Sequence, residues 1–423
     1  MSHSHNHQPS GEVDVLVIGA GPAGCISAAV MNQSGLKVRI VEREHFPRFV
    51  IGESLLPRCM DVLEDTGFLE ALKAKRFQEK FGAKFIHGEE VADFNFNEQF
   101  THGWTWTWQV PRAEFDLALA EEVTSRGVQV DFESTVTEIR INPDGCSTTS
   151  VVRKDGTGTS INARYIVDAS GYGRVIPKLF GLDHPSGLDP RRALFAHVND
   201  SHRNGYEEPN RILIIMSAPN VWVWIIPFSS GITSLGFVGN VEYFTSLPGD
   251  DAAQFNHLIH SNPYLKKRFG DVTFTMYPRH LEAWSSKSQS YYGNGYVLAG
   301  NVAEFLDPIF SSGVMFAMVS GHLAGKLVSR QLLGTSVDWT AEYAAVIQKG
   351  VDAFRSYVMA WYDGTLEKIF FARNPDHQIK NQICSVLAGY VWDENNPYVR
   401  DHSRSLKHLV KQIEFSNRMA GRP

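Results

Sequence analysis

The sequence predicts an α/β fold, in which a Rossmann-like parallel sheet is interleaved with an antiparallel sheet and followed by a helical C-terminal region. The first indication is a continuous β-branched run from Val13 to Ile18, which ends on a glycine. The second is an Ala-rich helical pattern from Cys25 to Gln33, followed by a second strand from Lys37 to Val41. Buried strands return near 128–132 and 161–168, so the first domain is discontinuous.

Length, composition and charge are those of an ordinary cytosolic enzyme. The 423 residues exceed the size of a single core, and 43% of them are hydrophobic. The net charge of −6 does not indicate the basic surface that nucleic-acid-binding proteins carry. The four cysteines lack any CxxC spacing, so we expect neither a metal site nor a disulfide framework, and a reducing, cytoplasmic location.

The N-terminus and the most apolar stretch predict neither a secretion signal nor a membrane span. His3, His5 and His7 could bind a metal by their alternate spacing, but we interpret them as a disordered leader or part of a tag, without function. The stretch from Arg211 to Phe228 is broken by prolines, and none of its runs reaches the roughly 20 residues of a spanning helix.

The middle of the chain predicts a second sheet. Between Phe81 and Trp108 aromatic and polar residues alternate, with Trp104, Trp106 and Trp108 at period two. Short β-like runs fill the stretch from Ala193 to Tyr277. We therefore assign two domains. The first is discontinuous and comprises residues 11–80, 109–190 and 285–335. The second contains the antiparallel sheet and comprises residues 81–108 and 191–284.

Helices complete the predicted fold. Helical patterns are expected near 60–75, from Glu114 to Arg126 and from Gly313 to about Leu333. The remaining region, 336–423, is helical. Near its end an apolar stripe at i, i+3, i+4, i+7 spacing predicts core packing rather than a partner or membrane helix; it comprises Leu406, Leu409, Val410 and Ile413.

A glycine motif between the first strand and helix predicts a dinucleotide site. Gly19, Gly21 and Gly24 form GxGxxG where a strand ends and a helix opens, which lets the backbone approach a pyrophosphate. Glu42 ends the second strand, where a ribose hydroxyl needs an acceptor. The acidic residue favours FAD or NAD over NADP, whose 2′-phosphate would be repelled.

Four further motifs resemble those of a flavoprotein family and therefore favour FAD over NAD as the dinucleotide. They are RFVIGESLLP (Arg48 to Pro57), QVPRAEFD (Gln109 to Asp116), VDASGYG (Val167 to Gly173) and GNVAEFLDP (Gly300 to Pro308). These motifs, and their order along the chain, resemble the successive FAD contacts of FAD-dependent aromatic hydroxylases and halogenases. The resemblance implies a glutathione-reductase or p-hydroxybenzoate-hydroxylase-like FAD-binding domain at 11–80, 109–190 and 285–335.

The resemblance also implies which residues hold the cofactor. Arg112 would reach its phosphate or ribityl region, and Asp168 would support it from a strand end. Asn301 stands where many relatives carry an aspartate, and its amide can still bond the ribityl chain. The implied cofactor residues are Gly19, Gly21, Ala23, Gly24, Glu42, Arg48, Ser54, Arg112, Val136, Asp168, Gly300 and Asn301.

Within this superfamily, the WxWxIP motif from Trp222 to Pro227 resembles flavin-dependent halogenases rather than hydroxylases. The resemblance implies that Trp222, Trp224, Pro227 and Phe310 separate flavin from organic substrate. Lys80 stands where such halogenases have their essential lysine, either as a chloramine or as a hydrogen-bond donor to hypohalous acid. Lys84 is a weaker candidate.

A turn before the helix of residues 313–333 predicts the halide site. Ser312 and Gly313 lie in FSSGV, and a helix N-terminus suits chloride or bromide. In tryptophan halogenases the resemblance places a glutamate where this chain has Phe310. This departure resembles the phenol and pyrrole halogenases, whose substrates are electron-rich.

The resulting hypothesis is an FAD-dependent halogenase of secondary metabolism. FADH2 from a separate flavin reductase reacts with oxygen, chloride or bromide is oxidised, and Lys80 directs hypohalous acid to an aromatic substrate, free or tethered to a carrier protein. The first alternative is an aromatic hydroxylase or a prenyl-type reductase on the same scaffold. The second is a non-catalytic flavin-binding protein.

Overall fold

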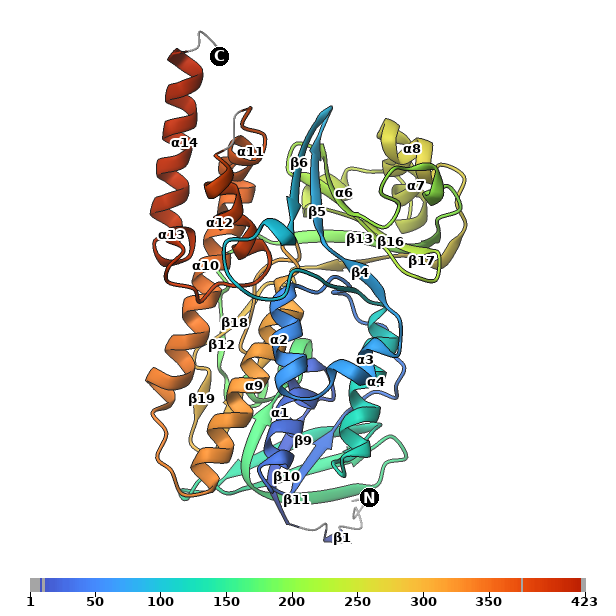
Figure 1. Cartoon of the computed structure of the whole chain (residues 1–423). Coiled ribbons are helices and arrows are strands. Elements are labelled where there is room, and N and C mark those ends of the chain that lie inside the picture. The colour runs from blue at the N-terminus through green and yellow to red at the C-terminus, as the bar shows by residue number, and fades with distance from the viewer. Residues whose placement is uncertain (1–7, 10–11, 374–375, 420–423) are drawn as a thin grey trace.

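Parallel strands form the centre of a nine-stranded sheet, as the sequence predicts (Figure 1). The computed structural model describes residues 8–9, 12–373 and 376–419, so His3, His5 and His7 lie outside the described residues. Neighbours from β20 through β11, β2 and β3 to β8 are parallel, and β19 joins β20 antiparallel. These strands are β2 Val13–Ile18, β3 Val38–Val41, β8 Gln129–Asp131, β11 Gly158–Asp168, β19 Tyr292–Gly293 and β20 Tyr296–Leu298.

An antiparallel hairpin extends this sheet beyond the predicted strands. Strand β10 (Ser147–Arg153) pairs with the first half of β11, β9 (Ser134–Ile141) pairs with β10, and β1 (Gln8–Pro9) pairs with β11 in parallel. Exposed and buried residues mix along β9. It therefore lacks the continuous apolar run by which a strand covered on both faces is found in a sequence.

Two buried helices pack against the parallel strands. Helix α1 (Pro22–Gln33) contacts β2, β3 and β11, and α9 (Ser312–Leu332) lies against α1. Helix α1 begins three residues before the predicted Cys25, because proline suits the first helical position. Helix α4 (Arg112–Ser125) packs on its other side.

The helix expected near 60–75 is divided in two. Helix α2 spans Pro57–Asp65 and α3 spans Leu69–Lys73. Between them Gly67 has φ +73°, a left-handed conformation that ends a helix. The predicted continuous helix was wrong at this glycine.

The second sheet has seven strands in the order β17-β13-β16-β15-β14-β5-β6. Neighbours are antiparallel except β14 and β5, which are parallel. In chain order the strands are β5 Gly82–His87, β6 Glu90–Asn95, β13 Arg191–Asn199, β14 Ile212–Ala218, β15 Val221–Pro227, β16 Ile232–Asn240 and β17 Phe274–Glu282.

Alternation along β15 divides its side chains between two cores. Trp222, Trp224 and Ile226 join the large core shared with the nine-stranded sheet. Val223 and Ile225 join a separate core with residues of α7 and α8. Successive side chains of a strand point to opposite faces, so the two indoles lie on the same face.

Three helices interrupt the region read as strands and turns. They cover the far face of the seven-stranded sheet (Figure 1) and are α6 Val241–Thr245, α7 Asp251–Ser261 and α8 Pro263–Phe269. Their shortness left little helical periodicity in the sequence. Of the tryptophans at period two, only Trp108 lies in a strand, namely β7 (Thr107–Gln109), which pairs with β4 (Gln78–Lys80).

The C-terminal region is helical, as predicted. A π-helical turn, Trp339–Ala344, leads into α10, and the last helix, α14, stands at the edge of the molecule (Figure 1). Leu406 and Leu409 are buried, with Val410 and Ile413 packed against the same core, which confirms core packing. The helices are α10 Ala345–Tyr362, α11 Thr365–Phe370, α12 His377–Leu387, α13 Pro397–Arg400 and α14 His402–Met419.

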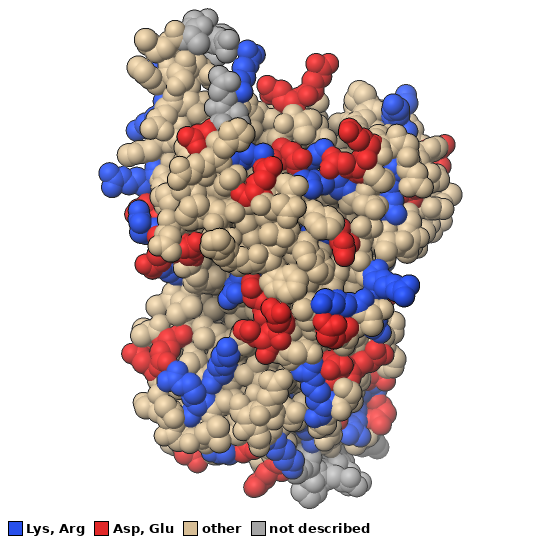
Figure 2. All heavy atoms as spheres, in the orientation of Figure 1, with Lys and Arg blue, Asp and Glu red and all other residues tan. Residues whose placement is uncertain are grey.

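On the face drawn in Figure 2, basic and acidic side chains are interspersed. Within the part of the chain that the structure describes, three or more His, Cys, Asp or Glu side chains nowhere gather in a way that could hold a metal ion. No helix among those residues has the length and apolar character needed to cross a membrane.

Candidate active site

A cavity of about 500 Å³ is lined on one side by strands of the seven-stranded sheet and on the other by the loops that follow strands of the nine-stranded sheet. Its walls also include the N-terminal ends of α1 and α9 and the segment before α2. The fold thus brings together residues that the sequence places far apart. The predicted site residues that line it are Gly19, Gly21, Ala23, Glu42, Arg48, Ser54, Arg112, Trp222, Trp224, Gly300, Asn301 and Gly313.

The other predicted residues do not line this cavity. Gly24 and Asp168 lie behind its wall, and Val136 lies on β9 and is not part of the lining. Ser312 is the buried first residue of α9. Lys80 and Phe310 line a second, adjacent cavity.

The glycine turn fits a pyrophosphate. Gly19 has φ +98°, and a Cβ there would lie 2.7 Å from the carbonyl oxygen of Ala169. A Cβ on Gly24 would overlap the carbonyl oxygen of Gly19. No side chain caps the N-terminus of α1, and its first turn holds no acidic residue. Its free N–H groups and partial positive charge therefore suit a phosphate.

Glu42 stands directly after β3 with both carboxylate oxygens anchored. One accepts a hydrogen bond from the Ala20 N–H and the other from the Glu44 N–H, each at 2.9 Å. The carboxylate is thereby fixed against the glycine turn and lines the cavity. Each oxygen keeps a lone pair for a ribose hydroxyl, which fits the predicted role.

Two arginines of the cavity wall share one buried carboxylate. Asp116 accepts from Arg112 Nε and Nη2 at 2.8 and 3.0 Å, and from Arg48 Nη1 at 2.9 Å. Burial opposes the charge on Arg112, yet Asp116 outweighs it and the pKa of Arg112 is raised. Asp116 was missed as a site residue, although it ends the QVPRAEFD motif. The i, i+4 spacing to Arg112 on a helix was the available signal.

Asp168 braces a turn rather than facing the cavity. Its oxygens accept from the Ser170 N–H at 2.9 Å and the Ile176 N–H at 2.7 Å. Burial raises its pKa, against these hydrogen bonds. Its support of the cofactor would therefore be indirect, through the turn 169–176 that contributes to the cavity wall.

The turn at Gly300 leaves one polar atom for a ligand. Gly300 has φ +79°, and its N–H donates to Ser320 Oγ at 2.8 Å. Asn301 Oδ1 is buried and, among the described residues, has no hydrogen-bond partner. Buried polar atoms are normally satisfied, so a donor from a bound group is expected here. With the glycine turn and Glu42, this fits a dinucleotide such as FAD.

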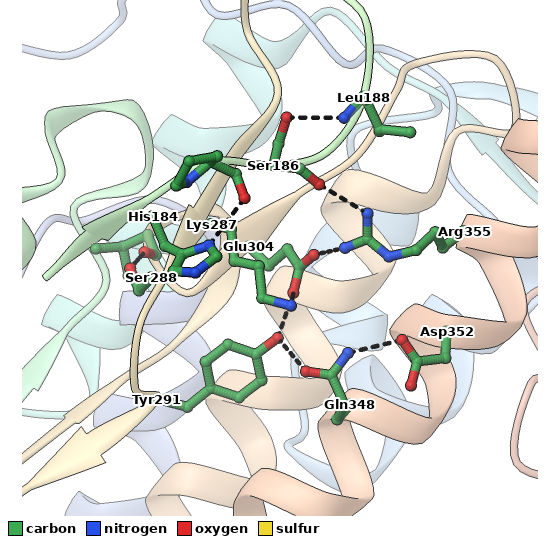
Figure 3. Close-up of polar contacts among 12 residues, drawn as sticks. His184, Ser186, Leu188, Lys287, Ser288, Tyr291, Glu304, Gln348, Asp352 and Arg355 are labelled. Carbon is green, nitrogen blue, oxygen red and sulfur yellow. Dashed lines mark hydrogen bonds and ion pairs between the residues drawn. The ribbon is translucent and has the colours of Figure 1, made fainter.

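The turn is held in place by a polar cluster around Glu304, which sequence reasoning missed. Glu304 of β21 (Glu304–Phe305) accepts from the Tyr291 hydroxyl and pairs with Arg355 of α10 (Figure 3). The Tyr291 hydroxyl oxygen also lies 2.9 Å from Gln348 Oε1, and Arg355 donates to the Ser186 carbonyl at 3.0 Å. These contacts hold the C-terminal helix α10 against the segment that follows the turn at Gly300.

Aromatic side chains of the seven-stranded sheet form one wall. Trp224 Nε1 donates to Ser234 Oγ at 3.0 Å, and its ring contacts Phe195. Both indoles are almost fully buried. Pro227 lies at the end of β15, where its carbonyl accepts from the Gln109 side chain. Phe310 packs instead against the aromatic rings of α10, namely Phe354, Tyr357 and Trp361.

Lys80 is a buried lysine with neutral partners. Its Nζ donates to Ser54 Oγ at 2.9 Å and to the Leu55 carbonyl at 2.8 Å, and lies over the Phe96 ring. Burial lowers the pKa of Lys80 to about 7, with Arg211 acting in the same direction and Cys59 against it. Lys84 instead pairs with Glu208 at the periphery. A perturbed, buried amine marks Lys80 as the functional candidate.

Ser54 links Lys80 to Ser311 at the N-terminus of α9, because it accepts hydrogen bonds from both side chains. Ser311 occupies the N-cap position of this helix and has a φ of +58°. Its Oγ donates to Ser54 Oγ at 3.0 Å. Ser54 lines the large cavity, Lys80 the small one, and Ser311 both. The small cavity is about 30 Å³, and its other lining is mostly apolar: Leu56, Ala83, Phe85, Phe94, Phe96, Ile212, Ile214, Ile309, Phe310 and Leu387.

Comparisons with known proteins agree with this geometry. Residues 12–346 match the model of a family described as FAD binding domain. The pyrrole-2-carbonyl carrier-protein brominase of Pseudoalteromonas luteoviolacea is 28% identical over 394 residues, covering 90% of this chain and 92% of the relative. A flavoprotein/dehydrogenase structure from Cytophaga hutchinsonii is 52% identical, with a TM-score of 0.94 over 96% of this chain and 100% of that one. The structure of the flavin-dependent brominase Bmp2 has 25% identity and a TM-score of 0.82, over 96% and 100% of the chains.

Proposed function

The chain belongs to the family of FAD-binding domain proteins and is a flavoprotein oxidoreductase; from this premise we propose that it halogenates an electron-rich aromatic ring of the pyrrole or phenol type. The observation that carries the proposal is Lys80, a buried amine in a small aromatic cavity beside the cofactor cavity. The relatives include a carrier-protein-dependent pyrrole brominase. A carrier-tethered ring is therefore part of the proposal.

The residues of the two cavities have separate tasks in this mechanism. When bound, FADH2 from a separate flavin reductase would supply two of the four electrons that oxygen takes up, and chloride or bromide would supply the other two as it is oxidised to hypohalous acid, with water as the second product. The N-terminus of α9, at Ser312 and Gly313, holds the halide by its N–H groups. The indoles of Trp222 and Trp224 keep the organic substrate away from the cofactor and exclude water.

Lys80 acts in the small cavity, whose lining shares Ile212, Ile214, Ile309 and Ser311 with the large cavity. Its amine receives the hypohalous acid and holds the halogen against the ring, either as a chloramine or by a hydrogen bond. Ser54 Oγ and the Leu55 carbonyl orient the amine, because both accept hydrogen bonds from it. The small cavity is about the size of one water molecule, so a ring enters only when lining side chains such as Phe94 rotate.

Phe310 accords with an electron-rich substrate. It packs among the rings of α10 and presents no carboxylate to the small cavity. A pyrrole or phenol needs no such group to react with hypohalous acid. A cytoplasmic location is also part of the proposal, supported by four free cysteines, of which Cys25, Cys59 and Cys384 are buried.

The test is aerobic turnover with reduced FAD, chloride or bromide, and a panel of pyrroles and phenols. Each ring is offered free and as a thioester on a carrier protein, and products are identified by mass spectrometry. A halogenated product that requires halide supports the proposal. Oxygenated product at the same rate without halide would contradict it.

A second candidate follows from the relative of 52% identity, which is described as a flavoprotein/dehydrogenase. In this reading the chain oxidises or reduces an organic substrate without halide, as a hydroxylase or reductase does. Rapid reduction of the bound flavin by NADPH alone would favour it. The halide-free arm of the same assay distinguishes the two candidates.

A further inference from the structure

Glu53 is a buried carboxylate in the wall of the cofactor cavity, and only one of its oxygens has a partner. His197 Nε2 donates to Glu53 Oε1 at 2.7 Å. No donor among the described residues reaches Oε2, and this atom has almost no contact with solvent. The side chain is 2% exposed and lines the cavity. An orphaned carboxylate oxygen at this place indicates a missing donor.

Arg112, whose charge interacts with Glu53, does not donate to that oxygen in the structure. Arg112 Nη1 donates to the carbonyls of Ile51 and Gly52 at 3.2 and 3.3 Å, and its other nitrogens bind Asp116. Its hydrogen bonds therefore go to Asp116, Ile51 and Gly52 and none of them reaches Glu53, although its charge favours a carboxylate nearby. Leaving one oxygen of a buried carboxylate without a donor destabilises the free protein. Such a cost is typical of a group that is completed by a ligand.

Glu53 is held from two sides. Its carbonyl accepts from the Val110 N–H at 2.8 Å, which fixes the backbone. The His197 ring on β13 makes edge contacts with Phe49 and Phe228, which set the direction of Nε2. The carboxylate is thus oriented before any ligand arrives.

We propose that Glu53 is a cofactor-binding residue, whose free oxygen accepts a hydrogen bond from an N–H or O–H group of FAD, and that His197 is its positioning residue. This assignment needs only the binding of FAD and goes beyond halogenation. It would hold equally if the organic substrate were not halogenated. Its test therefore measures binding in the absence of turnover.

The experiment compares the full-length apoprotein with Glu53→Leu and Glu53→Gln. FAD affinity is measured by fluorescence titration and stability by the Tm of the apoprotein. Glu53→Leu should raise the Kd for FAD by about tenfold or more, with an unchanged or higher apoprotein Tm. Glu53→Gln should recover part of the affinity, because its amide oxygen still accepts. A lower Tm with an unchanged Kd would show a purely structural tie and overturn the proposal.

His197 is tested through a double-mutant cycle. His197→Leu should raise the Kd for FAD, and His197→Gln should restore it because the amide can donate to Glu53. In the Glu53→Leu background His197→Leu should have no further effect, since His197 acts through Glu53. Additive losses would contradict that positioning role. His202, an exposed histidine paired with Asp271 at 2.9 Å, is the matched control, and His202→Ala should leave the Kd unchanged.

Discussion

Trp222 Nε1 donates a hydrogen bond to the Tyr362 hydroxyl at 3.2 Å. Tyr362 ends α10, and its own proton goes to Asp307 Oδ2 at 3.0 Å. Arg191 lies over the Tyr362 ring at 3.4 Å. The orientation of an indole in the cavity wall is therefore set by the C-terminal helices and by the GNVAEFLDP turn.

Removing this hydroxyl should loosen the wall. Tyr362→Phe leaves Trp222 Nε1 and Asp307 Oδ2 without their partner, so we expect the free energy of unfolding to fall by about 1–3 kcal/mol. The freed indole should also lower the ratio of halogenated product to oxygen consumed. Urea unfolding and an oxygen electrode measure these changes. Tyr292→Phe is the control, because among the described residues its exposed hydroxyl bonds only Thr340; an equal loss there would contradict a specific role of Tyr362.

Asp307 should make stability depend on pH. Burial raises its pKa from 3.8 to about 6, against hydrogen bonds from Ile309 and Tyr362 and the charge of Arg191. The folded protein thus binds this proton more tightly than the unfolded chain does. Its contribution is full below pH 3.8 and is lost as the pH rises through about 6.

The measurement is the free energy of unfolding of wild type minus that of Asp307→Asn. This difference should fall by up to about 3 kcal/mol between roughly pH 4 and pH 7. The asparagine does not titrate, so all other groups cancel. A difference that stays constant, or rises with pH, would contradict a raised pKa.

Lys80 should be needed for product but not for cofactor binding. Lys80→Met should retain the wild-type Kd for FAD and lose halogenated product by about a hundredfold or more, as expected for a group acting on the reacting atoms. Lys84→Met is the matched control, since Lys84 pairs with Glu208 away from the small cavity. Equal activity of the two variants would exclude Lys80 from the chemistry.

The Lys80 amine should titrate near neutrality. NMR of labelled lysine should give one Nζ with a pKa about 7 instead of 10.5, absent in Lys80→Met. Since the folded pKa is lowered, this lysine destabilises the fold most below pH 7. Stability relative to Lys80→Met should rise from pH 7 toward 10.5.

Gly24 should tolerate no side chain. Gly24→Ala places a Cβ on the Gly19 carbonyl, so the turn must move and the Kd for FAD should rise by at least about tenfold. Fluorescence titration measures the Kd. Gly205→Ala, where a Cβ would meet nothing within 4 Å, is the control. Normal binding by Gly24→Ala would contradict close packing at this turn.

The parallel sheet could be predicted because its signals are local. The run Val13–Ile18, the glycines after it and Glu42 lie within one strand-helix-strand unit, and the structure places them as expected. The predicted start of helix α9, Gly313, differs from the observed start, Ser312, by one residue, because its signals are local too. Family motifs added the residues near Gly300, which no periodicity indicates.

The rest depends on contacts between distant segments. Nothing local in the sequence joins Trp222 to Tyr362, or Glu53 to His197, because each pair is brought together only by the fold. The depth of Lys80 could not be read from its neighbours either, since glutamate and glutamine beside it suggest an exposed strand. Short helices such as α6 were missed because five residues carry no period.

The Glu304 cluster has a consequence for biosynthesis. Gly19 directly follows β2 and leaves the ribosome long before α10, whereas the turn at Gly300 is fixed only when α10 has emerged to supply Arg355 and Gln348. A nascent chain therefore cannot close the cavity until most of it has been translated. Loading with FAD should be among the last steps of maturation, and fragments released early should remain colourless.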